Sequence, residues 1–95
     1  MEFEWDRRKA AANLKKHGVS FPEAVTVFGD PLEITIPDPD HSAGEARFLS
    51  VGVTIENRLV VVAYTEREGS IRIINARRAA SKEQRDYASY EPKKR

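Results

Sequence analysis

The sequence contains no cysteine, which excludes disulfides, thiolate metal sites and cysteine nucleophiles. It contains only two histidines, and its Asp and Glu residues follow no metal-ligand spacing. No apolar run approaches membrane-spanning length, and the N-terminal MEFEWDRRK lacks the apolar region of a signal peptide. We therefore expect a soluble, cytoplasmic protein that uses neither a metal ion nor another cofactor.

The 95 residues leave room for one hydrophobic core, and 40% hydrophobic with 33% charged residues is typical of a globular domain. We expect a single domain over residues 1–95, with a flexible tail at 91–95. The net charge is only +1, but it is unevenly distributed. Residues 31–57 carry one Arg against five acids, whereas residues 58–95 carry ten Lys or Arg against five acids. This separation is typical of a protein with a basic face for a polyanion, although part of the surplus lies in the tail.

Two short helices are predicted in the first third of the chain. Asp6 can cap a helix over residues 7–17, and Gly18 can end it. A second helix follows the capping box SFPE, which starts at Ser20, and ends near Gly29. The short connection between the two predicts a helix hairpin. The stripe of the first helix that we expect to be buried comprises Ala10, Leu14 and His17.

Five short β-like runs accompany these helices, and an acidic loop covers residues 37–44. A further capping box, which starts at Ser81, predicts a short C-terminal helix. The order β-α-α-β-β-β-β-α predicts an α+β fold, an antiparallel sheet with the N-terminal helix hairpin packed on one face. The predicted strands span residues 3–5, 32–36, 46–55, 58–66 and 70–76.

Side-chain alternation predicts which residues share a face of the sheet. If the loops Glu56-Asn57 and Glu68-Gly69 have two residues each, position i pairs with 113 − i in the first hairpin and with 137 − i in the second. One face is then almost entirely apolar and suits the helices; it collects Leu49, Val51, Val53, Val60, Val62, Tyr64, Ile71 and Ile73. The opposite, open face collects Phe48, Ser50, Ala63, Thr65, Arg67, Arg72 and Ile74.

The open face supports two interpretations. Its arginines, hydroxyls and phenyl ring can form a phosphate-binding concavity with a stacking platform. Alternatively, Arg67 and Arg72 pair with nearby carboxylates and only stabilise the fold. The pattern does not decide between them, because a one-residue slip in register moves every side chain to the other face.

The first half of the chain contains the spaced residues Phe3, Trp5, Asp6, Lys9, Asn13, Lys16-His17-Gly18-Val19, Phe21, Glu23-Ala24, Val27-Phe28 and Asp30-Pro31. The second half contains Arg47-Phe48, Gly52 and the runs RLVVVAYTERE and IRIINARRAASKEQRDY. Together these residues, over positions 3–87, resemble the BrnT family of bacterial toxins. One position departs from the family, which often has Ser or Thr where this chain has Asn75. Because Asn75 lies inside a predicted strand, we expect this difference to change packing rather than activity.

The resemblance implies a fold and a function. BrnT proteins resemble the RelE superfamily of ribonucleases from type II toxin–antitoxin systems. The resemblance thus implies a small RelE-like endoribonuclease that cleaves RNA and inhibits translation. It also implies neutralisation by a BrnA-type ribbon-helix-helix antitoxin in a hetero-oligomer, which binds operator DNA only through the antitoxin. The alternative is a non-catalytic antitoxin-binding subunit that acts as a co-repressor of its operon.

RNA cleavage without a metal ion needs a base, an acid and cations that stabilise the developing phosphorane charge. An imidazole suits proton transfer because its unperturbed pKa is about 6.5. His17 is the better placed of the two histidines, since His41 lies in the acidic loop, although a histidine at a helix end can also be purely structural. Arginines would meet the phosphate charge, but Arg72 and Arg77 have opposite strand parity. The predicted catalytic residues are His17, Arg67, Arg72 and Arg77.

A second set of residues is predicted to contact RNA without taking part in proton transfer. Tyr87 is included because C-terminal tyrosines in RelE-like toxins can stack on a base or donate from the hydroxyl; alternatively, its ring only covers the sheet edge. Lys15 and Lys16 point in different directions, so we expect only one of them to reach the same groove as His17. The predicted RNA-binding residues are Lys15, Lys16, Phe48, Thr65, Arg78 and Tyr87.

Overall fold

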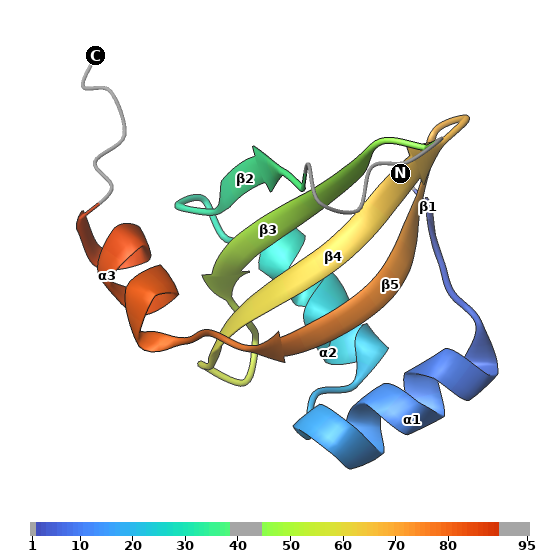
Figure 1. Ribbon diagram of the computed structural model, residues 1–95, viewed down its shortest axis with the longest axis horizontal. Coiled ribbons are helices and arrows are strands. Elements are labelled where there is room, and N and C mark those ends of the chain that lie inside the picture. Colours follow the sequence, from blue (N-terminus) through green and yellow to red (C-terminus); the bar gives the residue numbers. More distant parts are fainter. Residues whose placement is uncertain (1, 39–44, 90–95) are drawn as a thin grey trace.

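The computed structural model describes residues 2–38 and 45–89, which form an α+β fold (Figure 1). Most of the predicted acidic loop, with His41, and the predicted tail at 91–95 lie outside the described residues. The order of the elements is the predicted one. These elements are β1 (Glu2–Glu4), α1 (Arg7–His17), α2 (Phe21–Val25), the 3-10 helix η1 (Thr26–Gly29), β2 (Ile34–Pro37), β3 (Arg47–Val53), β4 (Leu59–Arg67), β5 (Ser70–Arg78) and α3 (Ser81–Ser89).

The five described strands form one mixed sheet in the order β1-β5-β4-β3-β2. Strands β2 to β5 pair with one another antiparallel, as predicted. The edge strand β1 is instead parallel to β5, with Phe3 opposite Ile71. The predicted antiparallel sheet is therefore right for four strands, and the relation to the RelE superfamily stays a prediction.

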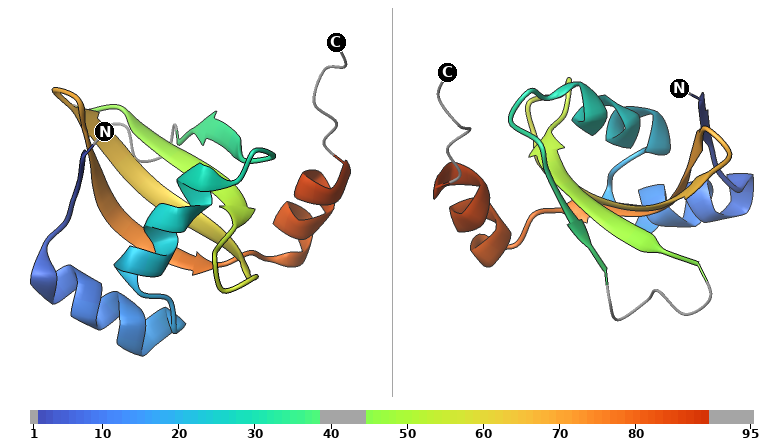
Figure 2. Two further views of the ribbon diagram at one scale, coloured as in Figure 1. Left: turned by 180° about the vertical axis from the view of Figure 1, so that it is seen from behind. Right: turned by 90° about the horizontal axis from the view of Figure 1, so that it is seen from above.

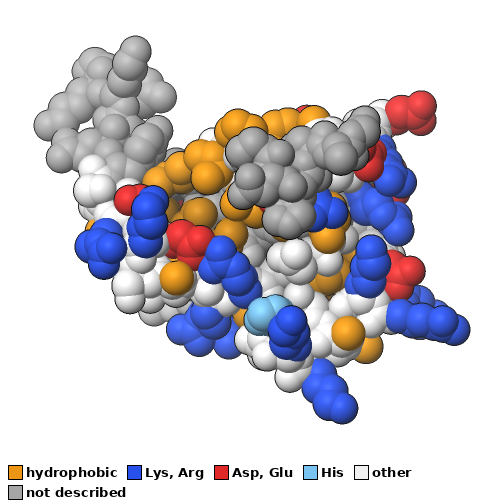
Figure 3. Space-filling view, in the orientation of Figure 1, with side chains coloured by type: hydrophobic (Ala, Val, Ile, Leu, Met, Phe, Trp, Pro, Cys, Tyr) orange, Lys and Arg blue, Asp and Glu red, His pale blue; other side chains and the backbone are white. Residues whose placement is uncertain are grey.

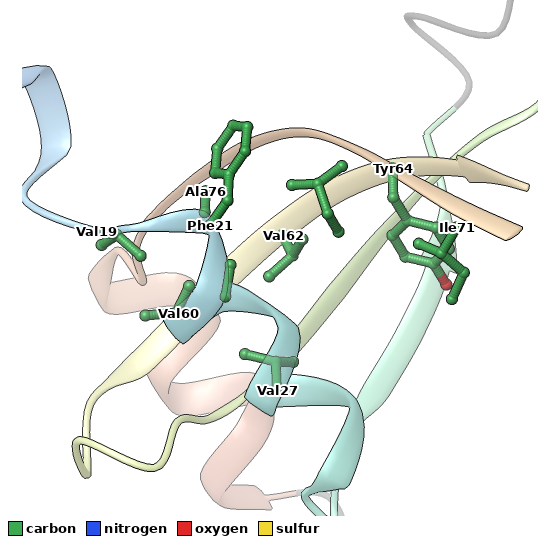
Figure 4. Packing of buried hydrophobic residues seen from close by; sticks show 10 residues of the cluster. Val19, Phe21, Val27, Val60, Val62, Tyr64, Ile71 and Ala76 are labelled. Atoms are coloured by element: carbon green, nitrogen blue, oxygen red, sulfur yellow. The ribbon is translucent and has the colours of Figure 1, made fainter. Parts of the chain in front are cut away.

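The main core lies on one face of the sheet, under α2 and η1 (Figure 2). Phe21 and Val27 from these helices belong to one buried cluster with Val62 and Tyr64 of β4, and Figure 4 labels these residues. α2 contacts β4 and β5, and η1 contacts β3, whereas α1 contacts β5. The fully buried members of this core are Val19, Phe21, Ala24, Val27, Val60, Val62 and Ala76.

The predicted ends of α1 are confirmed, but its predicted buried stripe is wrong at Leu14, whereas Ala10 packs partly buried against the core and His17 is half-buried. The Asp6 carboxylate accepts hydrogen bonds from the backbone N–H groups of Arg8 and Lys9, at 2.8 and 3.1 Å, and Gly18 has a φ of 71°. Leu14, however, is 50% exposed, and Asn13 is the buried side chain of the helix.

Asn13 attaches α1 to β5 by hydrogen bonds to the side of β5 that faces away from β4. Its amide nitrogen donates to the carbonyl of Ala76 at 2.8 Å, and its oxygen accepts from the N–H of Ala76 at 3.1 Å. β1 pairs with β5 only as far as Arg72, so the backbone of Ala76 has no strand neighbour on that side among the described residues. Asn13 supplies the partner that a buried backbone group requires, and this fixes α1 against β5.

The first hairpin has a register different from the predicted one. Its loop is longer than two residues, because Val53 pairs with Leu59 and the N–H of Thr54 donates to the carbonyl of Arg58 at 2.8 Å. The Thr54 hydroxyl favours this longer loop by accepting from the N–H of Glu56 at 3.1 Å. Position i of β3 therefore lies opposite 112 − i. The shift by one residue brings Phe48 and Ser50 to the core face and sends Leu49 and Val51 to the open face.

The second hairpin has the predicted two-residue loop, with positive φ at Glu68 and Gly69 and Thr65 opposite Arg72. A β-bulge follows, because Tyr64 pairs with Ile73 whereas Ala63 pairs with Asn75. The extra residue reverses the alternation along β5. Arg72 and Arg77, which have opposite parity in the sequence, therefore lie on the same open face.

Candidate functional site

The open face of the sheet, opposite α2, carries a groove made of three adjoining hollows. Figure 3 views this face and shows Lys and Arg side chains gathered around it. The "Thr65 hollow" is lined by Lys9, Glu45, Arg47, Thr65, Arg67, Arg72 and Ile74. The "His17 hollow", between α1 and β5, is lined by Lys9, Ala12, Asn13, Lys16, His17, Ile74, Asn75 and Arg77. The "central hollow" is lined by Asp38, Arg47, Leu49, Ala63, Asn75 and Arg77.

The Thr65 hollow is built by a row of residues across three strands. Arg47 of β3 lies opposite Thr65 of β4, and Thr65 lies opposite Arg72 of β5. Arg67 lies two residues further along β4 on the same face, and Lys9 reaches the hollow from α1. Three arginines of the sheet and one lysine of α1 thus lie around one buried hydroxyl.

The arginines of the groove make ion pairs at its rim. Arg67 forms a bidentate pair with Glu45, at 2.8 and 3.1 Å, and this pair lowers the pKa of Glu45, with Arg72 and Arg47 adding to the effect. Arg72 lies 3.2 Å from a carboxylate oxygen of Glu4. Both pairs are partly exposed, and solvent screening makes the contribution of such pairs to stability small. The two interpretations of the open face are therefore compatible, because the arginines are paired and a hollow still opens between them.

Arg77 is held more firmly than the other two. Its guanidinium donates to both carboxylate oxygens of Glu83, at 2.6 and 2.7 Å, and this lowers the pKa of Glu83. Glu83 also accepts from the backbone N–H of Ala80 at 2.8 Å, at the start of α3. Arg77 thereby ties α3 to the sheet while it lines the His17 and central hollows.

The predicted catalytic residues divide between neighbouring hollows. His17, half-buried at the end of α1, lines one hollow together with Lys16 and Arg77. Arg67 and Arg72 line the other. Lys9 lines both, so it marks the place where the two hollows adjoin.

Several residues predicted to bind RNA lie outside the groove. The prediction that Phe48 lies on the open face is wrong: its ring packs against the core and stacks on Tyr64, with centroids 5.7 Å apart. Arg78 pairs with Val60, whose side chain is on the core face, so Arg78 does not share the face of Arg72. Lys15 is exposed and is not one of the residues that line the three hollows.

Tyr87 packs on residues of β3 and β4 and is not one of the residues that line the three hollows. Its ring packs against Val51, Val61 and Ala79, and its hydroxyl donates to a carboxylate oxygen of Asp30. Burial, together with this hydrogen bond, raises the pKa of Tyr87 to about 12. The tyrosine therefore holds α3 against β3 and β4, away from the residues that line the groove.

Sequence reasoning missed three charged residues of the Thr65 hollow as site residues: Lys9, Glu45 and Arg47. Lys9 and Arg47 belong to the spaced residues that carry the family resemblance, and that signal could have identified them. Glu45 could not be found in this way, because its position follows from its pairing with Arg67.

The described residues contain neither a membrane-spanning helix nor a cluster of metal ligands. No helix in the described part of the chain is long and apolar enough to cross a membrane. Within residues 2–38 and 45–89, no group of three or more His, Asp or Glu side chains is arranged to hold a metal ion.

Comparisons with known proteins agree with the fold. A family model described as "Ribonuclease toxin, BrnT, of type II toxin-antitoxin system" matches residues 5–83. The crystal structure of the ribonuclease toxin BrnT from Brucella abortus is similar to this chain, with a TM-score of 0.67 and 19% sequence identity. The similarity covers 85% of this chain and 99% of the Brucella chain. A comparison with curated proteins finds no match.

Proposed function

Because the chain belongs to the BrnT family of ribonuclease toxins from type II toxin–antitoxin systems, we propose that it is an endoribonuclease that cleaves RNA without a metal ion and thereby inhibits translation. In this proposal the RNA strand lies along the groove of the open face. It places the protein in the cytoplasm, where its RNA substrates are, and it includes a RelE-like mode of catalysis.

The row Arg47–Thr65–Arg72 is the observation that carries this proposal. Three strands aim two guanidinium groups and a hydroxyl at one hollow, and Arg67 and Lys9 border it. Arginine binds phosphate oxygens through paired N–H donors, and preorganised cations stabilise the charge that develops on a phosphorane. A rigid sheet holds these groups in place before the substrate arrives, which is what such stabilisation requires.

In this proposal the residues at the two ends of the groove have different catalytic roles. Arg67 and Arg72 bind phosphate in the Thr65 hollow, while His17 transfers a proton in the neighbouring hollow and Arg77 stabilises charge there. Lys9, which lines both hollows, and Lys16 contact the RNA backbone between them. Phe48, Arg78 and Tyr87 take no part in this mechanism, because their contacts lie elsewhere.

We further propose that a BrnA-type ribbon-helix-helix antitoxin binds the toxin as a hetero-oligomer and that operator DNA is contacted only through the antitoxin. The alternative function, a non-catalytic subunit that tunes repression, uses the same partner. It is favoured by one observation, that Arg67, Arg72 and Arg77 all carry carboxylate partners in this structure. The two functions differ in whether RNA is cut.

Cleavage by the purified protein, freed of antitoxin, tests the proposal. We expect it to cut a labelled RNA in the presence of EDTA, and we expect Arg72→Ala to reduce the rate at least about a hundredfold, as loss of a charge-stabilising donor does. The matched control is Arg85→Ala, which removes an exposed arginine of α3 outside the groove. Circular dichroism and a melting curve check that both variants are folded.

Two results would contradict the proposal in different ways. RNA that stays intact in EDTA but is cut after Mg²⁺ is added would show that the cleavage depends on a metal ion. RNA that stays intact under both conditions, with an antitoxin that still binds, would support the non-catalytic subunit.

A further inference from the structure

The hydroxyl of Thr65 is a buried polar group without a hydrogen-bond partner among the described residues. The side chain is only 4% exposed, and it lines the hollow between Arg47 and Arg72. Most buried polar side-chain atoms in proteins are hydrogen-bonded, because burying an unpaired donor or acceptor is costly. The hydroxyl oxygen itself has almost no accessible surface, so a ligand in the adjoining cationic hollow accepts its hydrogen bond only once the side chains around it shift.

The carboxylate of Glu45 occupies the place that such a ligand would take on Arg67. Its two oxygens accept from Nε and Nη2 of Arg67, at 2.8 and 3.1 Å, which is the fork geometry that a phosphate also adopts. The side chains of the pair are 50% and 43% exposed. A pair this exposed is weak, so an incoming anion can displace it.

We propose that the Thr65 hollow binds one phosphate group of the RNA and that Glu45 holds Arg67 until this phosphate displaces it. In the bound state the hydroxyl of Thr65 donates to one phosphate oxygen, and Arg67 and Arg72 donate to the others. Glu45 is then an internal competitor of the substrate and not a part of the catalytic machinery. The identity of the ligand as RNA rests on the proposed function, whereas the phosphate site itself does not.

The charge and size of the hollow favour a phosphate. Four cationic residues line the hollow and Glu45 is the one acid among its lining residues, while Glu4 pairs with Arg72 from outside it, so an anion in the hollow meets cationic donors on several sides. Its volume is about 170 Å³, which is several times the roughly 30 Å³ that a water molecule occupies. A tetrahedral phosphate offers oxygens in several directions, which matches donors that come from three strands and a helix.

Binding measurements on the full chain without antitoxin test this proposal. The probes are inorganic phosphate and a short 2′-O-methyl RNA, which has no free 2′-OH and cannot be cut. In ¹H–¹⁵N spectra we expect both probes to shift the amide signals of Thr65, Arg67 and Arg72. Glu45→Gln should strengthen binding of both by about twofold to fivefold, whereas Glu56→Gln, which alters an exposed acid of the β3–β4 loop, should leave it unchanged.

The variant Thr65→Val removes the hydroxyl and keeps the shape of the side chain. We expect it to weaken binding of both probes about fivefold to tenfold without lowering the melting temperature, because no hydrogen bond of the described protein is lost. Thr35→Val, on the exposed part of β2, is the matched control. Unchanged binding in Thr65→Val, or weaker binding in Glu45→Gln, would overturn the proposal.

The remaining outcomes separate this proposal from the proposed function. If the 2′-O-methyl RNA binds through Thr65 but ordinary RNA stays intact, the phosphate site stands and the nuclease fails. If Thr65→Val cuts RNA with an unchanged KM, the nuclease stands and the phosphate site is overturned. If an acidic peptide shifts the same amide signals while phosphate and RNA do not, the hollow receives a carboxylate of a protein partner and the proposal is wrong.

Discussion

At the scale of single residues, Glu23 joins three segments that are far apart in the sequence. Its carboxylate, largely buried in α2, accepts from the Thr54 hydroxyl at 2.7 Å and forms an ion pair with the guanidinium of Arg58. Arg58 also donates to the carbonyl of Gly18 at 2.9 Å. The capping box predicted at Ser20 is therefore only half formed: Ser20 accepts from the N–H of Glu23, but the carboxylate of Glu23 is engaged with the β3–β4 loop.

We expect Glu23→Gln to lower the free energy of unfolding by about 2 kcal/mol, because it leaves the partly buried guanidinium of Arg58 without its counter-charge. The effect should depend on pH. The hydrogen bond from Arg58 lowers the pKa of Glu23, so the stabilisation is fully present above the unfolded-state pKa near 4.5 and is lost as the pH falls through the lower folded-state pKa.

Urea unfolding between pH 7 and pH 3 measures this contribution. The difference between the wild type and Glu23→Gln should shrink toward the acid end, and the exposed variant Glu56→Gln should follow the wild type throughout. A difference that stays constant across this range would show that the charge of Glu23 is not the cause.

At the scale of elements, α3 is attached to the sheet through a few contacts at its two ends. None of its residues is buried. The bidentate pair of Glu83 with Arg77 holds its first turn, and the hydrogen bond from Tyr87 to Asp30 holds its last turns. A helix with so little buried surface opens before the core does, because local stability follows burial.

We expect Tyr87→Phe to loosen α3 without unfolding the sheet, at a cost of about 1 kcal/mol in its opening free energy. Hydrogen exchange should show faster exchange for residues 81–89 and unchanged exchange in β4. The wild type should lose the same contact at high pH: because the pKa of Tyr87 is raised to about 12, this stabilisation is present below pH 10 and is lost as the pH rises through 12. Equal exchange of α3 in wild type and variant would contradict this role of the hydroxyl.

The elements could be predicted from the sequence where one local feature determines them. Asp6 and Gly18 define the ends of α1, and Glu68-Gly69 determines the tight turn of the second hairpin. The first hairpin could not be predicted in register, because the side chain of Thr54 stabilises a longer loop. The register of this hairpin differs from the predicted one by one residue, and Phe48 therefore lies in the core and not on the open face.

The candidate site was predictable only in its parts. Thr65 and Arg72 lie opposite each other as predicted, because the register between them is measured from the tight turn. Arg47 joins this row through the register that was missed, and Arg77 shares the face through a bulge that no sequence signal indicated. The register between distant strands depends on the length of every loop between them, and the local sequence pattern does not determine those lengths.

At the scale of the whole molecule, the groove concentrates positive charge on a protein that is nearly neutral. The net charge is +1, yet six cationic residues line the three hollows, with two acids among them. Long-range attraction of RNA is therefore weak, and binding depends on contacts at short range within the groove. Salt dependence measures how many phosphates these contacts neutralise.

We expect the affinity for the 2′-O-methyl RNA to fall by roughly twentyfold to fiftyfold between 50 and 200 mM salt, the change that about three to four phosphate contacts produce on a single strand. Arg72→Ala should reduce the slope of log K against log salt by about 0.7, because it removes one such contact, whereas Arg85→Ala should leave the slope unchanged. Fluorescence anisotropy at four salt concentrations gives both slopes. An affinity independent of salt would show that the RNA does not lie along these cations, and equal slopes for the two variants would show that Arg72 does not touch a phosphate.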